Sequence, residues 1–168
     1  MKKTIFSFAI ILACFLTTLT QAYAQTSDSD KELEEKIKSK LVGTWVFQNA
    51  SKASGLAGLA ATNKENALAK RLATTQYEGS EYTFNEDGTY QHKGTDFLKA
   101  KFTYAGTWKF DDTLLVLTAK TYNGMPLDKE SASAWDYVIV SSKELGANVK
   151  CKPAGEEEVV AKINFKRK

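Results

Sequence analysis

Side chains that could perform catalysis or bind a metal are few in this sequence. The chain has one histidine, His92, and two cysteines, Cys14 and Cys151. A Ser-His-acid triad would have to use His92, and no carboxylate near it in the sequence has a suggestive spacing. No zinc-ligand spacing is present either. We therefore expect no enzyme activity, no metal and no cofactor. His92 is interpreted as a surface or rim residue, and haem ligation by His92 is the alternative that stays open.

Aromatic side chains are the group with the clearest potential for binding. Ten of them would face inward on the strands predicted below: Tyr82, Phe84, Tyr90, Phe102, Tyr104, Trp108, Phe110, Trp135, Tyr137 and Phe165. Several bring hydroxyl or indole N–H groups, and a few convergent polar groups in an apolar cup are typical of a small-molecule site. We expect Tyr82, Tyr104, Trp108 and Tyr137 to line such a cup, with Phe84, Tyr90, Phe102 and Trp135 beside them. A small barrel can also fill completely with side chains, and this alternative stays open.

The elements that must position these residues are strands. From Leu41 onward the apolar pattern has a period of two, most clearly from Lys101 to Phe110, where one face is apolar and the other polar. An Asn-Glu-Asp-Gly turn between alternating segments is a strong hairpin signal. Eight strands are predicted, at residues 42–48, 79–85, 88–93, 100–110, 113–120, 134–141, 144–152 and 157–166. Their short connections predict an all-β meander that closes into an eight-stranded antiparallel up-and-down barrel.

One long connection, residues 49–78, interrupts this meander. Its second half is predicted to be a helix, because Thr62 and Glu65 have capping-box spacing and Leu68 and Leu72 lie one turn apart. Glycines weaken any helix in its first half. A connection of this length is usually functional or mobile, and we expect it to act as a lid or plug.

The first 24 residues have the pattern of a signal peptide. Lys2 and Lys3 precede an apolar stretch, and Ala-Tyr-Ala stands before Gln25. Export to the periplasm or beyond is expected. Ile11 to Cys14 faintly resembles a lipobox, so an outer-membrane lipoprotein is the alternative.

Residues 25–40 are predicted to be a polar lead and a short amphipathic helix, with Ser29 and Glu32 as a capping box, and residues 41–168 the barrel domain. Cleavage before Gln25 would leave Cys151 as the single thiol, so no intrachain disulfide is expected. The chain carries 23 basic and 20 acidic residues, a balance without the footprint of a nucleic-acid partner.

Three segments together resemble the lipocalins, and more closely the small bacterial lipocalin-like domains of exported proteins. They are "LVGTWVF" at residues 41–47, "YTFNEDGTY" at 82–90 and "GTWKFDDTLLVLT" at 106–118. The resemblance covers about residues 38–166 and implies a calycin-type barrel with a cup for a small apolar molecule. It also implies that Gly43 and Trp45 form the floor, with Arg167 as the basic residue across the indole ring. The missing disulfide and the helical insertion depart from many secreted lipocalins.

Gly-Thr-Trp occurs twice, within residues 41–47 and 104–110. In both places Gly and Trp would point inward, so we interpret each copy as a packing device in which the glycine leaves room for an indole.

The leading hypothesis is an exported, monomeric barrel that binds a small hydrophobic or amphipathic molecule. The second is a filled barrel that contacts a protein partner of the cell envelope. An enzyme or inhibitor on the same barrel is a weaker third.

Overall fold

The structure is a computed structural model that describes residues 35–96, 98–111, 113–152, 155 and 157–168. The predicted signal peptide, Cys14, and the Ser29–Glu32 capping box lie outside the described residues. Residues 37–168 form one compact unit, and the fold described below is that of this unit. Residues 37–41 are helical and lead directly into the first strand.

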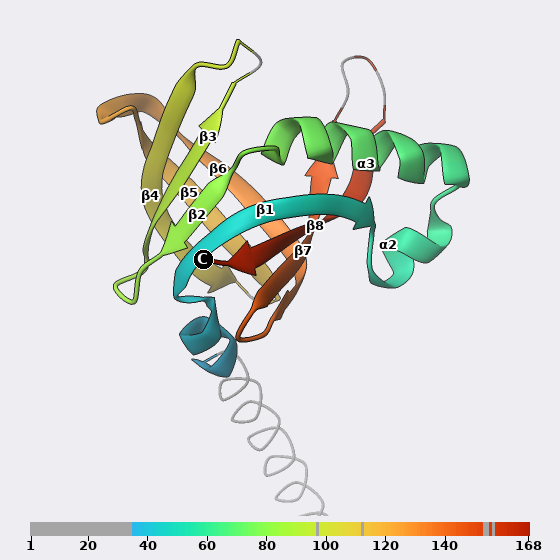
Figure 1. Ribbon diagram of the computed structural model, residues 1–168, viewed down its shortest axis with the longest axis horizontal. Helices are drawn as coiled ribbons and strands as arrows, with labels where there is room; N and C mark the ends of the chain where they lie inside the picture. The colour runs from blue at the N-terminus through green and yellow to red at the C-terminus, as the bar shows by residue number, and fades with distance from the viewer. Residues whose placement is uncertain (1–34, 97, 112, 153–154, 156) are drawn as a thin grey trace, which may run out of the picture. The chain divides into compact units, whose positions relative to one another are not determined.

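The predicted fold class is confirmed: eight antiparallel strands close into a barrel in which each strand pairs with its neighbours in the sequence and the last pairs with the first (Figure 1). The strands are β1 (Gly43–Lys52), β2 (Glu81–Phe84), β3 (Thr89–Thr95), β4 (Lys101–Asp111), β5 (Leu114–Tyr122), β6 (Met125–Val140), β7 (Glu144–Cys151) and β8 (Val159–Arg167). Closure pairs every strand on both sides, so no sheet edge is left open.

Strand β6 is longer than predicted. It begins at Met125, because Asn123 and Gly124 form a two-residue hairpin turn after β5 with φ angles of 50° and 81°. Asn-Gly suits such a turn because both central residues need a positive φ. The strand predicted at 134–141 therefore starts too late. The sequence pattern missed the first half of β6 because that half is mostly exposed and lacks apolar alternation.

A bulge in β6 reverses the direction of the side chains that follow it. The register of β6 against β7 shifts between Asp136 and Ile139, and Tyr137 has a φ of 52°. Tyr137 is therefore 50% exposed, and Val138 and Val140 pack against the core in its place. The prediction that Tyr137 faces inward and lines the cup is wrong.

The long connection contains two helices, α2 (Gly55–Ala60) and α3 (Asn63–Tyr77). Strand β1 continues to Lys52, so the predicted insertion at 49–78 begins too early. The capping box is present: Thr62 accepts a hydrogen bond from the Glu65 N–H, and the Glu65 carboxylate accepts one from the Thr62 N–H. Helix α3 packs on β1 and β8 through a buried face that includes Ala69, Ala73 and Tyr77 (Figure 1). None of the described helices is long and apolar enough to span a membrane.

At the opposite end of the barrel, Arg167 covers Trp45. The guanidinium carbon lies 4.3 Å from the centroid of the indole ring, and the guanidinium donates hydrogen bonds to the carbonyls of Val42 and Lys40. The Trp45 Nε1–H donates to the Leu41 carbonyl at 2.7 Å. Arg167 thus joins the end of β8 to the segment that leads into β1.

The sequence suggested that the glycine of each Gly-Thr-Trp copy leaves room for an indole. In the structure, the neighbours that these glycines accommodate are different groups. Gly43 has a φ of +131°, and a Cβ there would collide with the Arg167 guanidinium. A Cβ at Gly106 would lie 1.9 Å from the Thr118 carbonyl oxygen, where a register shift brings β5 close to β4. Each glycine permits a close approach, one by a side chain and the other by a backbone.

Replacement of Arg167 by leucine is expected to lower the free energy of unfolding by about 2 kcal/mol. It removes a cation over an aromatic ring and two carbonyl hydrogen bonds, and leaves a shorter apolar side chain at the end of β8. Urea denaturation of Arg167→Leu measures the loss. The matched control is Lys168→Ala, because the Lys168 side chain is exposed and its one ion pair among the described residues is with Glu81, at 2.8 Å. This substitution is expected to change stability by less than about 0.5 kcal/mol. Equal effects of the two substitutions would contradict the role given to Arg167.

Candidate functional site

Much of the barrel interior is filled by aromatic side chains. Phe84, Trp135 and Phe165 are at most 2% exposed, and Trp135 stacks on Phe165 with ring centroids 5.6 Å apart. Trp108 is also buried, and its Nε1–H donates to the Asn85 carbonyl at 3.1 Å. Of the residues predicted to line a cup, Phe84, Trp108 and Trp135 therefore belong to the packed core.

The interior is less completely covered toward the end of the barrel where α3 lies. His92, Phe102, Tyr104 and Tyr122 come from β3, β4 and β5, and are only partly buried. We call these four residues the aromatic shelf. Cross-strand pairing places His92 beside Tyr104 and Tyr104 beside Tyr122, and paired residues share one face of a sheet. The Tyr104 ring centroid lies 5.0 Å from that of Tyr122 and 5.5 Å from that of Phe102, so the shelf is continuous.

The inner face next to the shelf carries small polar side chains. Ser133 pairs with Leu117 and Ser131 pairs with Ala119, so both serines share the face of buried residues. Both serines are nevertheless exposed. This part of the inner face of β6 is therefore open to solvent, in contrast to the packed core.

His92 connects the shelf to the core. Its ring stacks on Tyr82 with centroids 4.1 Å apart, and its Nε2 shares a hydrogen bond of 3.0 Å with the hydroxyl of the buried Ser80. Desolvation lowers the pKa of His92 to about 4, so the imidazole is neutral at pH 7. The sequence interpretation of a rim histidine agrees with this position. The sequence did not predict the contact with Tyr82, because this contact arises from the pairing of β2 with β3.

Two tyrosines beneath the shelf are neutral as well. Burial raises the pKa of Tyr82 well above its usual range and that of Tyr90 to about 12. Neither hydroxyl has a hydrogen-bond partner among the described residues, so each can still donate or accept. Both residues were predicted to line a cup, and they lie at the boundary between packed core and shelf.

Tyr122 is a shelf residue that the sequence analysis missed. The register of β5 shifts between Ala119 and Thr121, against both β4 and β6. Leu115 and Leu117 point inward before the shift, and after it the even-numbered Tyr122 lies on the same face as Tyr104. The Asn-Gly turn that follows Tyr122 was the available signal for extending β5 and beginning β6 early.

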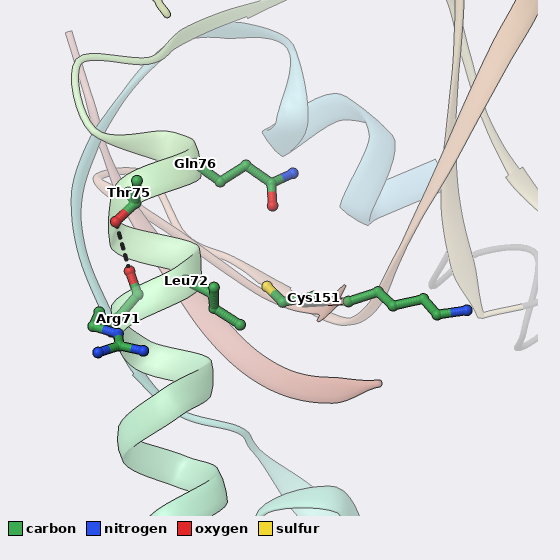
Figure 2. A pocket seen from close by; sticks show the side chains of 6 residues that line it. Arg71, Leu72, Thr75, Gln76 and Cys151 are labelled. Carbon is green, nitrogen blue, oxygen red and sulfur yellow. Dashed lines mark hydrogen bonds between the residues drawn. The ribbon is translucent and has the colours of Figure 1, made fainter. Parts of the chain in front are cut away.

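A separate pocket of about 280 Å³ lies between α3 and the end of β7. Its lining residues are Arg71, Leu72, Thr75, Gln76, Cys151 and Lys152. Figure 2 shows the Leu72 side chain and the Cys151 sulfur pointing toward one another across it. Cys151 is 3% exposed, and burial raises the pKa of its thiol. The described residues contain no group of three or more His, Cys, Asp or Glu side chains placed to hold a metal ion.

These features define a class of protein: a single eight-stranded barrel with an aromatic interior, a basic residue stacked on a tryptophan at one end and a helix at the other. The chain belongs to the family described as "Domain of unknown function (DUF5004)", which matches residues 18–164.

Among solved structures, the chain is similar to a DUF4847 family protein from Bacteroides vulgatus ATCC 8482. The identity is 19%, the match covers 77% of this chain and 94% of that chain, and the TM-score is 0.36. No curated protein matches the chain.

The stability of the domain is expected to fall as the pH decreases from about 6.5 to about 4. The unfolded chain protonates His92 near its ordinary pKa of about 6.5, whereas the folded state resists protonation until about pH 4. Acid therefore favours the unfolded state. Between pH 6.5 and pH 4 the free energy of unfolding should decrease by up to about 3 kcal/mol. Urea denaturation at pH 7, 6, 5 and 4.5 measures this decrease.

Because His92 is the one histidine of the chain, His92→Phe serves as the matched control. It keeps an aromatic ring and removes the titration, so its stability should change much less between pH 7 and 5. An NMR titration that gives His92 of the folded protein a pKa near 6.5 would refute the prediction.

Proposed function

We propose that this domain is a lipocalin-like binding protein, not an enzyme, and that it holds a small, mostly apolar molecule at the end of the barrel where α3 lies. The observation that carries this proposal is the aromatic shelf. Its rings face the barrel interior, yet they remain partly accessible. A partner that covers them gains about 25 cal/mol for each Å² of apolar surface removed from water.

The distribution of packing supports a site at this end. Trp45 is 0% exposed and Arg167 covers it at the other end, as the resemblance to lipocalins implied. The core between the two ends is filled, so a deep cup is not part of the proposal. The ligand is instead held by the shelf, with Tyr82 and Tyr90 beneath it, and α3 borders the same end of the barrel from its position on β1 and β8.

A filled barrel that contacts another protein is the second candidate. The observation in its favour is an outer apolar patch formed by Leu56 and Leu59 of α2 together with Tyr137 and Ile139 of β6. These side chains are between 50% and 83% exposed. The start of α2 adjoins the patch residue on β6, because a Cβ at Gly55 would lie 3.1 Å from the Tyr137 ring.

Native mass spectrometry of the domain, purified without detergent from the periplasm of an expressing bacterium, tests the first proposal. The expected result is an excess mass that disappears on denaturation. Tyr104→Ala is expected to reduce the occupied fraction and to lower affinity by about tenfold, because it removes the central ring of the shelf. Thr107→Ala, on the outer face of the same strand, is the matched control and should leave occupancy unchanged.

A bare mass that persists after incubation with fatty acids, sterols and haem would reject the binding proposal. In that case the outer apolar patch becomes the surface to test for a protein partner. If Tyr104→Ala and Thr107→Ala reduced occupancy equally, the ligand would not rest on the shelf.

We also propose that the domain acts after export. The support is the basic and apolar pattern of residues 1–24. Determination of the N-terminus of the mature protein should give a start near Gln25. A start at a lipid-modified Cys14 would instead favour an outer-membrane lipoprotein.

A further inference from the structure

The side chain of Ser80 makes a single hydrogen bond within the described part of the chain. Ser80 lies between α3 and β2 and is 1% exposed, and its Oγ lies 3.0 Å from Nε2 of His92. The hydroxyl makes no other hydrogen bond to a described residue. The direction of this one hydrogen bond therefore decides whether a buried donor is left without an acceptor.

The direction that satisfies the hydroxyl places the imidazole proton of His92 on Nδ1. Desolvation lowers the pKa of His92 to about 4, so the ring carries one proton at pH 7. If Ser80 donates to Nε2, only lone pairs of the Ser80 oxygen stay unused. If Nε2 donates instead, the Ser80 proton is enclosed without an acceptor. The first arrangement is favoured, because a buried donor without an acceptor costs more free energy than an unused lone pair.

The second ring nitrogen of His92, Nδ1, is accessible from outside. It makes no hydrogen bond to any described residue. The side-chain nitrogens and oxygens of the described residues that are enclosed without a partner are Asn66 Oδ1, Trp135 Nε1 and Arg167 Nε, and Nδ1 of His92 is not one of them. This agrees with the partial burial of His92 in the aromatic shelf.

The rings around His92 stand side by side along the sheet. The His92 ring lies at 8° to that of Tyr82, with centroids 4.1 Å apart, and at 23° to that of Tyr104. These residues lie on the neighbouring strands β2, β3 and β4, so ring edges and not ring faces point away from the sheet. Ring edges carry partial positive charge. Together with an N–H donor, they suit an acceptor atom and the face of an aromatic ring.

We propose that the His92 Nδ1–H is a hydrogen-bond donor of the aromatic shelf, that Ser80 is the positioning residue that fixes this tautomer, and that the ligand is an uncharged aromatic molecule with a carbonyl or ether oxygen. This inference rests on the proposed binding function and narrows its ligand class. A carboxylate suits the position poorly, because a neutral donor does not offset the cost of burying a charge. Haem ligation does not suit this tautomer, because Ser80 occupies the lone pair of Nε2 and Nδ1 carries the proton.

NMR spectroscopy of the ¹⁵N-labelled mature chain tests the tautomer directly, because His92 is the one histidine of the sequence. Long-range ¹H–¹⁵N correlation spectra at pH 7 distinguish a protonated ring nitrogen from an unprotonated one. The expected result is a protonated Nδ1 and an unprotonated Nε2. Ser80→Ala should increase the share of the Nε2–H tautomer, and Ser80→Thr, which keeps a hydroxyl, should restore the parent spectrum.

The probes for the ligand class are 1-tetralone and tetralin, which share a fused two-ring frame and differ by a carbonyl oxygen. Tetralone should move the Nδ1 signal of His92 much more than tetralin does. His92→Phe keeps an aromatic ring and removes the donor, so it should weaken tetralone binding about fivefold and change tetralin binding by less than about twofold. Tyr122→Phe is the matched control and should change neither affinity, because the hydroxyl that it removes lies one strand further from His92 than Tyr104 does.

Three outcomes would count against the inference. A free protein with the His92 proton on Nε2 would overturn it without any ligand. If tetralone bound equally well to the parent and to His92→Phe and left the Nδ1 signal in place, His92 would not be the donor, and the shelf proposal would stand. If neither probe bound, the ligand class would be wrong. The native mass measurement would then decide whether the proposed function fails with it.

Discussion

The rest of the structure depends on the closure of β1 against β8, and Arg167 holds that seam. The two strands lie at opposite ends of the domain sequence, so their pairing carries a large loop-closure cost in the unfolded chain. Trp45 pairs directly with Arg167 across the seam, and the guanidinium also bonds to carbonyls of the segment before β1. One side chain thus provides the cation over the ring and the hydrogen bonds that fix where β1 begins. Gly43 contributes by leaving space for this guanidinium.

Closure at this seam also determines where the helices of the long connection lie. Strand β1 passes into α2 and α3 at the end of the barrel opposite Arg167, and α3 packs on the same two strands that form the seam. Small side chains at Ala69 and Ala73 allow the helix to approach the strands closely, and Tyr77 places its ring among those of Phe47, Trp135 and Phe165. The shelf strands β3, β4 and β5 are not the ones on which α3 mainly packs, which is consistent with the partial exposure of their inner face.

Local patterns made the barrel predictable, and non-local pairing limited the prediction of the site. The alternation from Lys101 to Phe110, the Asp-Gly turn and the Thr62–Glu65 capping box are all set by residues close in sequence, so they appear without knowledge of partners. A bulge has no comparable signature, because it depends on which strand lies opposite. One bulge turned Tyr137 outward and another register shift brought Tyr122 inward. The role of Gly106 was misread for the same reason, since the carbonyl that it accommodates belongs to the neighbouring strand.

The electrostatic character of the interior follows from its packing. Burial lowers the pKa of His92 and raises the pKa values of Tyr77, Tyr82, Tyr90 and Cys151, so all five groups are neutral at pH 7. Such an interior offers hydrogen-bond donors and acceptors without a formal charge among these groups. A ligand with a buried charge would find no counter-ion among them, whereas a neutral ligand gains from apolar contact and from the hydroxyl groups of Tyr82 and Tyr90. Selection at this end of the barrel would therefore depend on shape and on the position of an acceptor atom, more than on charge.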